Sequence, residues 1–140
     1  MLAGTVQHRS YFDQQIAPRL SHDATWVGHL CLESLGRLIR GSAVGVVTPL
    51  WDEPFGLVVA EMLACGTPVA ATDRGAISSF VDPAVAALSP AETPAGVAAA
   101  IDRAAGLDRT TCRRHAATRL SDDRMVDAYV VQYRAAIATH

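Results

Sequence analysis

Two glutamates, Glu53 and Glu61, have the residue type and the spacing to bind sugar hydroxyl groups. Seven residues separate them, and the chain contains only two other glutamates. Carboxylates accept paired hydrogen bonds from neighbouring hydroxyl groups. At a rise of ~1.5 Å per residue, Glu61 is expected about 8 Å along a helix that begins just after Glu53. A diphosphate at the start of this helix would place a ribose near Glu61 and its other substituent near Glu53.

The turn between the two glutamates predicts an anion site. Pro54 suits the first turn of a helix, because its missing N–H is not needed there. Gly56 has no side chain, so a ligand can approach the backbone closely. The N–H groups at 55–57 would then face the ligand, and the helix dipole favours an anion. The purely structural alternative is that Glu53 caps the helix and Glu61 lies on its surface.

The composition limits what such a site can use. All 12 basic residues are arginine, and the formal net charge is −2. A sequence-independent nucleic-acid binder needs a surplus of cations, so this class is disfavoured. Without lysine, an anion site must use arginine or backbone N–H groups.

The three cysteines and five histidines are scattered along the chain, in no spacing typical of metal ligands. We therefore expect no metal site. The chain shows neither a run of ~18 apolar residues nor a secretion signal, and we expect a soluble, cytoplasmic protein without a membrane span. Its length fits one domain, residues 1–140, and no internal linker interrupts it.

Short apolar runs alternate with helical patterns, which predicts an α/β fold. The predicted strands are residues 1–6, 25–27, 44–48, 68–71 and 86–88. The predicted helices are residues 11–17, 32–39, 55–64, 94–105, 109–118 and 122–137. Nearly continuous apolar strands favour a parallel sheet with helices on both faces, followed by a helical C-terminal tail. Open α/β sheets bind ligands beyond the carboxyl ends of their strands, so the loop after 44–48 is the candidate site.

The residues around the two glutamates resemble the signature of a known family. Residues 51–70 read WDEPFGLVVAEMLACGTPVA. This string resembles the donor-binding signature of retaining GT-B glycosyltransferases of family 4, the group 1 transferases. Weaker resemblance extends over residues 11–13, 16–18, 27–30 and 124–133. The resemblance implies a Rossmann-like sheet that forms the C-terminal, nucleotide-sugar donor-binding half of a GT-B fold.

The resemblance also implies a role for each site residue. Glu61 would hold the ribose hydroxyls of a nucleotide diphosphosugar, linked to UDP or GDP. Glu53 would be the catalytic residue, in contact with hydroxyls of the transferred sugar. The sugar and the diphosphate would lie under the backbone amides of Phe55, Gly56 and Leu57. Leu30 would lie against the base, and transfer would retain the anomeric configuration, typically without a bound metal.

The sequence departs from the family pattern at the diphosphate. Family members carry an arginine and a lysine there, on a strand and turn that would precede Met1. We therefore expect this first strand-and-turn and the whole N-terminal acceptor domain to be missing. Arg74 follows a predicted strand and is expected on the surface, with a place in the cleft as the alternative. For Trp51, loop packing and ligand contact are equally compatible with the sequence.

Two functions of different classes fit these observations. The chain is either the donor-binding domain of a glycosyltransferase or a nucleotide-sugar-binding or interaction module that cannot catalyse alone. A dinucleotide-dependent oxidoreductase is disfavoured, because no Gly-x-Gly-x-x-Gly follows a strand. Apolar residues of the last helix, which would pack on an acceptor domain, predict self-association. These residues are Met125, Val126, Tyr129, Val130 and Tyr133.

Overall fold

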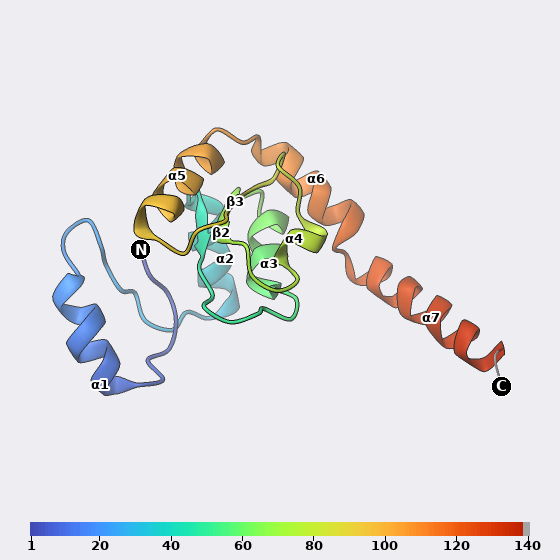
Figure 1. The fold of residues 1–140 in the computed structure, drawn as a ribbon, viewed down its shortest axis with the longest axis horizontal. Helices are drawn as coiled ribbons and strands as arrows, with labels where there is room; N and C mark the ends of the chain where they lie inside the picture. The colour runs from blue at the N-terminus through green and yellow to red at the C-terminus, as the bar shows by residue number, and fades with distance from the viewer. Residues whose placement is uncertain (139–140) are drawn as a thin grey trace. The chain divides into compact units, whose positions relative to one another are not determined.

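The computed structural model describes residues 1–138, and the chain divides into two units. The first unit runs from Met1 to Leu38, and the second begins at Ile39. Figure 1 shows the helices and strands of both units.

The first unit holds a short parallel pairing in place of the strand predicted at 1–6. Leu2 forms an isolated bridge with Trp26, and the Gly4 N–H donates to the carbonyl of Gly28 at 2.9 Å. The Trp26 indole also donates to the carbonyl of Gly4, at 3.1 Å. An isolated pair of strands is only marginally stable in water, and this explains why the pairing stays short.

The helix predicted at 11–17 begins earlier, ends later and changes type along its length. It consists of α1 (Arg9–Tyr11), the π-helical η1 (Phe12–Ile16) and the 3₁₀-helical η2 (Ala17–Arg19). Pro18, which follows the predicted range, does not end the helical stretch. Proline lies in the first turn of a new 3₁₀ segment, where its missing N–H is not needed.

A parallel three-stranded sheet forms the centre of the second unit, as predicted. Its strands are β1 (Gly45–Val47), β2 (Val69–Thr72) and β3 (Ala86–Ser89), in the order β1-β2-β3. Val46 pairs with Ala70, and Ala70 pairs with Ala87. All four residues of β2 are buried, because this strand lies between the other two and is covered on both faces.

Helices cover both faces of this sheet (Figure 1). α3 (Leu57–Ala64) and α6 (Arg109–Arg119) pack on one face, where Leu63, Val69 and Cys112 share a core. α5 (Pro94–Ala105) packs on the other face through a small core built largely of alanines. Successive residues of β2 alternate between the two cores, as the pleat of a strand requires. The predicted α/β class, with a parallel sheet and helices on both faces, is therefore confirmed.

Side chains fix the ends of several helices. Thr93 caps α5 through the Gly96 N–H at 3.1 Å, and Asp108 caps α6 through the Thr111 N–H at 2.6 Å. Hydrogen bonding from the Thr111 side chain, and then from this N–H, lowers the pKa of Asp108, because it favours the charged carboxylate. The Arg109 guanidinium donates to the carbonyl of Arg40, at 2.7 Å, at the end of α2 (Leu32–Gly41). A helix C-terminus leaves carbonyls unpaired, so this contact secures the chain before β1.

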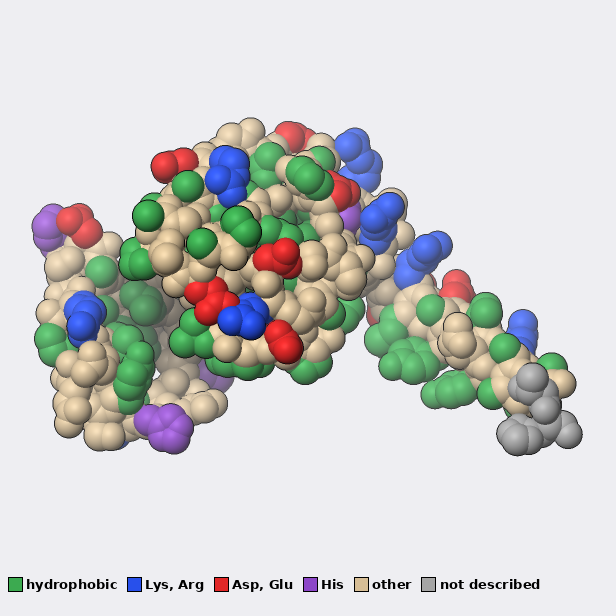
Figure 2. All heavy atoms as spheres, in the orientation of Figure 1, with side chains coloured by type: hydrophobic (Ala, Val, Ile, Leu, Met, Phe, Trp, Pro, Cys, Tyr) green, Lys and Arg blue, Asp and Glu red, His purple; other side chains and the backbone are tan. Residues whose placement is uncertain are grey.

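Two further helices, α4 and α7, differ in how well the sequence predicts them. α4 (Ile77–Phe80) was not expected, because a four-residue helix is too short to show a hydrophobic period. α7 (Asp122–Ala138) was expected over nearly the same residues, and none of its residues is buried. Figure 2 shows hydrophobic side chains gathered along one side of this helix. Within residues 1–138, no helix has the length and apolar character that a membrane crossing requires.

Candidate functional site

A hollow of about 590 Å³ lies beyond the carboxyl end of β1, where the sequence predicts the site. The end of β1, the loop that follows it and the first turn of α3 form its walls. Its lining residues are Val46, Val47, Thr48, Pro49, Trp51, Glu53, Pro54, Phe55, Gly56, Leu57 and Val58. Four of the six predicted site residues therefore share one hollow. They are Glu53, Phe55, Gly56 and Leu57.

α3 begins at Leu57, two residues later than predicted, and Pro54 therefore precedes its first turn. Gly56 is the N-cap residue and has a left-handed backbone with φ of +85°. This conformation is open to glycine and costly for other residues, and it turns the chain into the helix. The Phe55 ring stacks on the Phe80 ring, with centroids 5.0 Å apart. Phe55 thus packs against α4 and does not begin the helix.

The Glu53 carboxylate is half-buried at the start of α3 and has two protein partners. Its Oε1 accepts from the Gly56 N–H at 3.2 Å, and its Oε2 accepts from the Trp51 indole N–H at 3.2 Å. The N–H of Gly56 is therefore not free, contrary to the prediction for this turn. The structural alternative holds for this contact, because Glu53 caps the chain that enters α3.

Trp51 has a packing role in the loop and also lines the hollow, and its contact with a ligand stays a prediction. The residue is 64% exposed and lines the hollow, and its indole N–H donates a hydrogen bond to the Glu53 carboxylate. An exposed aromatic face beside a carboxylate supplies an apolar surface next to a hydrogen-bond acceptor.

Glu61 and Leu30 do not line the hollow. Glu61 is exposed on α3, one turn after Leu57 and on the same face of the helix. Glu61 therefore lies further along α3, on the helix face that begins at Leu57. Leu30 is half-buried and belongs to the first unit. The roles of both residues stay predictions.

The loop that carries Glu53 is supported from β2 by residues that the sequence did not single out. Thr72, at the end of β2, is 1% exposed, and its hydroxyl donates to the carbonyl of Pro49 at 3.0 Å. The Ala76 N–H donates to the carbonyl of Glu53 at 2.8 Å. The motif Asp-Arg-Gly after a strand is typical of a turn, but it does not reveal which loop the turn touches.

Arg74 lies between two acidic side chains. Its Nε donates to Glu92, and its Nη1 lies 3.9 Å from the Asp52 carboxylate. The hydrogen bond from Arg74 lowers the pKa of Glu92. Arg74 is half-exposed, as the sequence favoured, and the lining residues of the hollow include no basic side chain.

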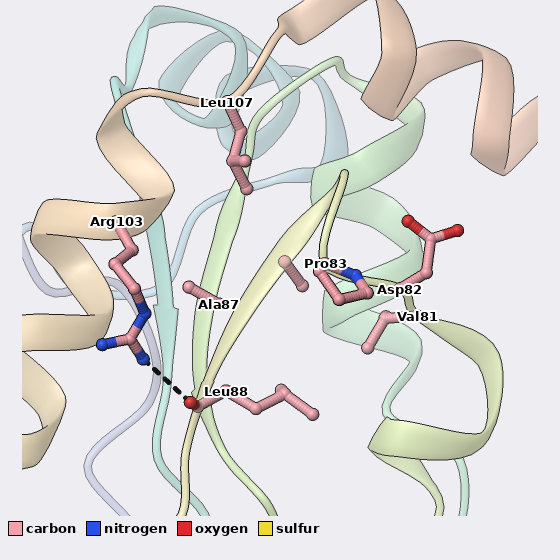
Figure 3. A pocket seen from close by; sticks show the side chains of 8 residues that line it. Val81, Asp82, Pro83, Ala87, Leu88, Arg103 and Leu107 are labelled. Atoms are coloured by element: carbon pink, nitrogen blue, oxygen red, sulfur yellow. Dashed lines mark hydrogen bonds between the residues drawn. The ribbon is translucent and has the colours of Figure 1, made fainter.

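A second hollow of about 460 Å³ lies along the outer edge of β3 (Figure 3). Arg103 reaches across it from α5 and donates to the carbonyl of Leu88 at 3.0 Å. The carboxylate of Asp82 points away from Arg103 in this view and lies 3.4 Å from the His115 ring. Arg103 thus occupies a carbonyl of the edge strand β3 that could otherwise pair with a strand of another chain. Covering an edge in this way is a common protection against such pairing.

Metal ligands do not gather anywhere in the part of the chain that the structure describes. Residues 1–138 contain no group of three histidine, cysteine, aspartate or glutamate side chains that could hold a metal ion.

The parallel sheet with helices on both faces, together with this signature loop, defines a glycosyltransferase fold of the GT-B type. The chain belongs to the family of group 1 glycosyl transferases, whose sequence profile matches residues 1–106. It is 37% identical over 110 residues to a D-inositol 3-phosphate glycosyltransferase of Geodermatophilus obscurus. It is 36% identical over 113 residues to one of Mycolicibacterium vanbaalenii. These matches cover 75% and 77% of this chain but 24% and 25% of the relatives, so the chain spans about a quarter of their length.

Solved structures show the same fold. AviGT4, a glycosyltransferase involved in avilamycin A biosynthesis, matches with a TM-score of 0.84 at 27% identity, over 99% of this chain and 42% of that protein. Sucrose-phosphate synthase from Thermosynechococcus elongatus matches with a TM-score of 0.68 at 28% identity, over 85% of this chain and 32% of that protein. The predicted resemblance to GT-B transferases of group 1 is confirmed.

Proposed function

We propose that the chain binds a nucleotide diphosphosugar, linked to UDP or GDP, as the donor for sugar transfer with retention at the anomeric carbon. Family membership supports sugar transfer as the reaction class. The observation that carries the donor assignment is the Glu53 carboxylate, which is held at the mouth of the hollow beside the start of α3. We also propose a cytoplasmic location, which is the expectation from the sequence.

Glu53 can cap the entry to α3 and bind a sugar at the same time. Each oxygen of a carboxylate has two lone pairs that accept hydrogen bonds. Oε1 uses one for Gly56 and Oε2 uses one for Trp51, so each oxygen keeps one for a sugar hydroxyl. The hydroxyls of the transferred sugar would lie on this side of the hollow, and those of the ribose would lie further along α3 at Glu61.

The start of α3 is suited to the departing diphosphate. When the bond between sugar and diphosphate breaks, negative charge grows on the diphosphate oxygens. The leading N–H groups of a helix have no partner within the helix, and the positive end of its dipole lies there. Such fixed dipoles stabilise developing charge without having to reorganise. Leu57, the first residue of α3, lines the hollow at this point.

One observation favours the second candidate, a module that binds nucleotide sugars without catalysing transfer alone. The diphosphate carries two negative charges or more, and the lining residues of the hollow supply no cation. Arg74, which follows β2, is engaged by Glu92 and Asp52. Binding without turnover by the isolated chain would support this candidate. In that case an acceptor domain, on a partner or a longer chain, would complete the transferase.

Replacing Glu61 by alanine is expected to weaken binding of UDP, GDP or their sugars at least tenfold. The reason is that a carboxylate in contact with two ribose hydroxyls makes charge-assisted hydrogen bonds, and these contribute more than neutral ones. Isothermal titration of the 140-residue chain with UDP, GDP, ADP and their glucose or mannose conjugates measures the effect. Asp102→Ala, at an exposed carboxylate on α5, is the matched control and should bind as the wild type does. Unchanged binding in Glu61→Ala would refute the ribose role.

Self-association through α7 is expected at high protein concentration. Met125, Tyr129 and Tyr133 repeat every four residues, and each is more than half exposed. An uncovered apolar face of this length tends to find a partner. Light scattering after size exclusion should show a mass above that of the monomer, and Tyr129→Glu with Tyr133→Glu should restore the monomer. A strict monomer at millimolar wild-type concentration would contradict the prediction.

A further inference from the structure

The turn after β2 lies directly against the backbone of Glu53. The Ala76 N–H donates to the Glu53 carbonyl at 2.8 Å. Gly75 has φ of +61°, a left-handed conformation that other residues adopt at a cost. A methyl group added at Gly75 would overlap both the amide nitrogen and the carbonyl oxygen of Glu53. It would also lie 2.7 Å from the carbonyl carbon of Asp52. Only a residue without a side chain fits between these two loops.

Two further contacts tie the same loops together. Thr72, just before the turn, donates from its buried hydroxyl to the carbonyl of Pro49. Arg74, within the turn, has its Nη1 3.9 Å from the carboxylate of Asp52. The loop after β1 is therefore held near its beginning, at Pro49, and again at Glu53. Pro49 and Glu53 line the hollow, whereas Thr72 and Arg74, which hold the loop from the other side, do not.

We propose that the turn 74–76 is a positioning element for the Glu53 carboxylate, with Gly75 as the residue that allows it. The hydrogen bond from Ala76 fixes the peptide group of Glu53. A fixed peptide leaves the side chain only its own rotations, and Gly56 and Trp51 then select one arrangement of the carboxylate. Placement within a fraction of an ångström decides whether a carboxylate meets two hydroxyls at once, so loss of this contact would act on sugar recognition.

The Trp51 indole N–H reports the position of Glu53, because it donates to Oε2. The chain has only two tryptophans, so its ¹⁵N spectrum contains two indole signals, which Trp51→Phe assigns. Gly75→Ala should move the Trp51 signal by at least half of the shift seen in Glu53→Ala. Gly106→Ala is the matched glycine control, because a methyl there would lie an ordinary 3.7 Å from the Arg103 carbonyl. Leu63→Ala controls for a general loss of stability, and both controls should leave the signal in place.

The effect on ligands rests on the function proposed above. Gly75→Ala should weaken the binding of UDP-glucose or GDP-mannose at least fivefold. The affinity of the variant for UDP or GDP alone should stay within twofold of that of the wild type. A merely structural loss would weaken both kinds of ligand equally and would overturn the proposal. If wild type binds none of these ligands, the proposed function fails, and the Trp51 signal still decides the positioning role.

A measurement on the unaltered protein guards against a variant that does not fold. The Ala76 amide should exchange its hydrogen with solvent at least 100-fold more slowly than an unstructured amide, because it donates to Glu53. Exchange at the unstructured rate would show that the turn does not hold Glu53, and it would overturn the proposal whatever the variants do. An unmoved Trp51 signal in a folded Gly75→Ala protein would do the same.

Discussion

Replacing Leu63 by alanine is expected to lower the free energy of unfolding of the second unit by about 3 kcal/mol. Leu63 is fully buried on α3 and belongs to the core that joins this helix to the sheet and to α6. Truncation removes apolar contacts and leaves a cavity, and each adds to the cost. The close packing of α3 against β2 limits how far the neighbours can move to fill the space. Circular dichroism in a urea titration measures the change.

Val131→Ala provides the matched control for this experiment. Val131 is also an aliphatic residue on a helix, but it is 61% exposed on α7. Its truncation should change the free energy of unfolding by no more than about 0.5 kcal/mol. Equal losses in the two variants would mean that α3 does not pack as described.

Replacing Thr72 by valine is expected to cost about 1–2 kcal/mol of stability and to weaken donor binding as well. Valine has nearly the same shape as threonine, so the packing of β2 is preserved. The carbonyl of Pro49, however, loses the buried hydroxyl that donates to it at 3.0 Å. A buried carbonyl that loses its donor is no longer compensated for its lost hydration, and this destabilises the folded state. Because Pro49 begins the loop to Glu53, the loosened loop should also hold the carboxylate less firmly.

Thermal unfolding and nucleotide-sugar titration of Thr72→Val separate the two effects. Thr72→Ser keeps the hydroxyl and should retain binding, although it loses one buried methyl group. If valine and serine have the same effect on binding, the hydrogen bond to Pro49 does not support the site.

The sequence predicts the sheet of the second unit well because parallel strands leave a simple pattern. Residues 44–48, 68–71 and 86–88 are almost continuously apolar, and strands form at each of them, shifted by no more than a residue or two. The segment at 1–6 is also apolar, yet it makes only an isolated bridge. Local composition was similar in both cases. What differs is pairing: β2 has a neighbour on each side, whereas Leu2 pairs with Trp26 alone.

The candidate site was predictable in its location but not in its internal contacts. The loop after β1 and the first turn of α3 do form a hollow that contains Glu53, Phe55, Gly56 and Leu57. The hydrogen bond between Trp51 and Glu53 depends on two side-chain rotamers, which the order of residues does not specify. The contact of Gly75 with Glu53 joins loops that follow different strands, so it becomes visible only once the sheet is assembled.

The two hydrogen bonds that Glu53 accepts from Gly56 and Trp51 also limit how this site can change during evolution. Under the proposed function, a mutation at Glu53 would alter both sugar recognition and the entry to α3, so most alternative residues would be lost before they could acquire a new preference. Leu57 and Val58 line the same hollow with exposed side chains and leave the loop intact when they vary. New donor preferences would therefore accumulate at these wall positions, while the carboxylate itself stays constant.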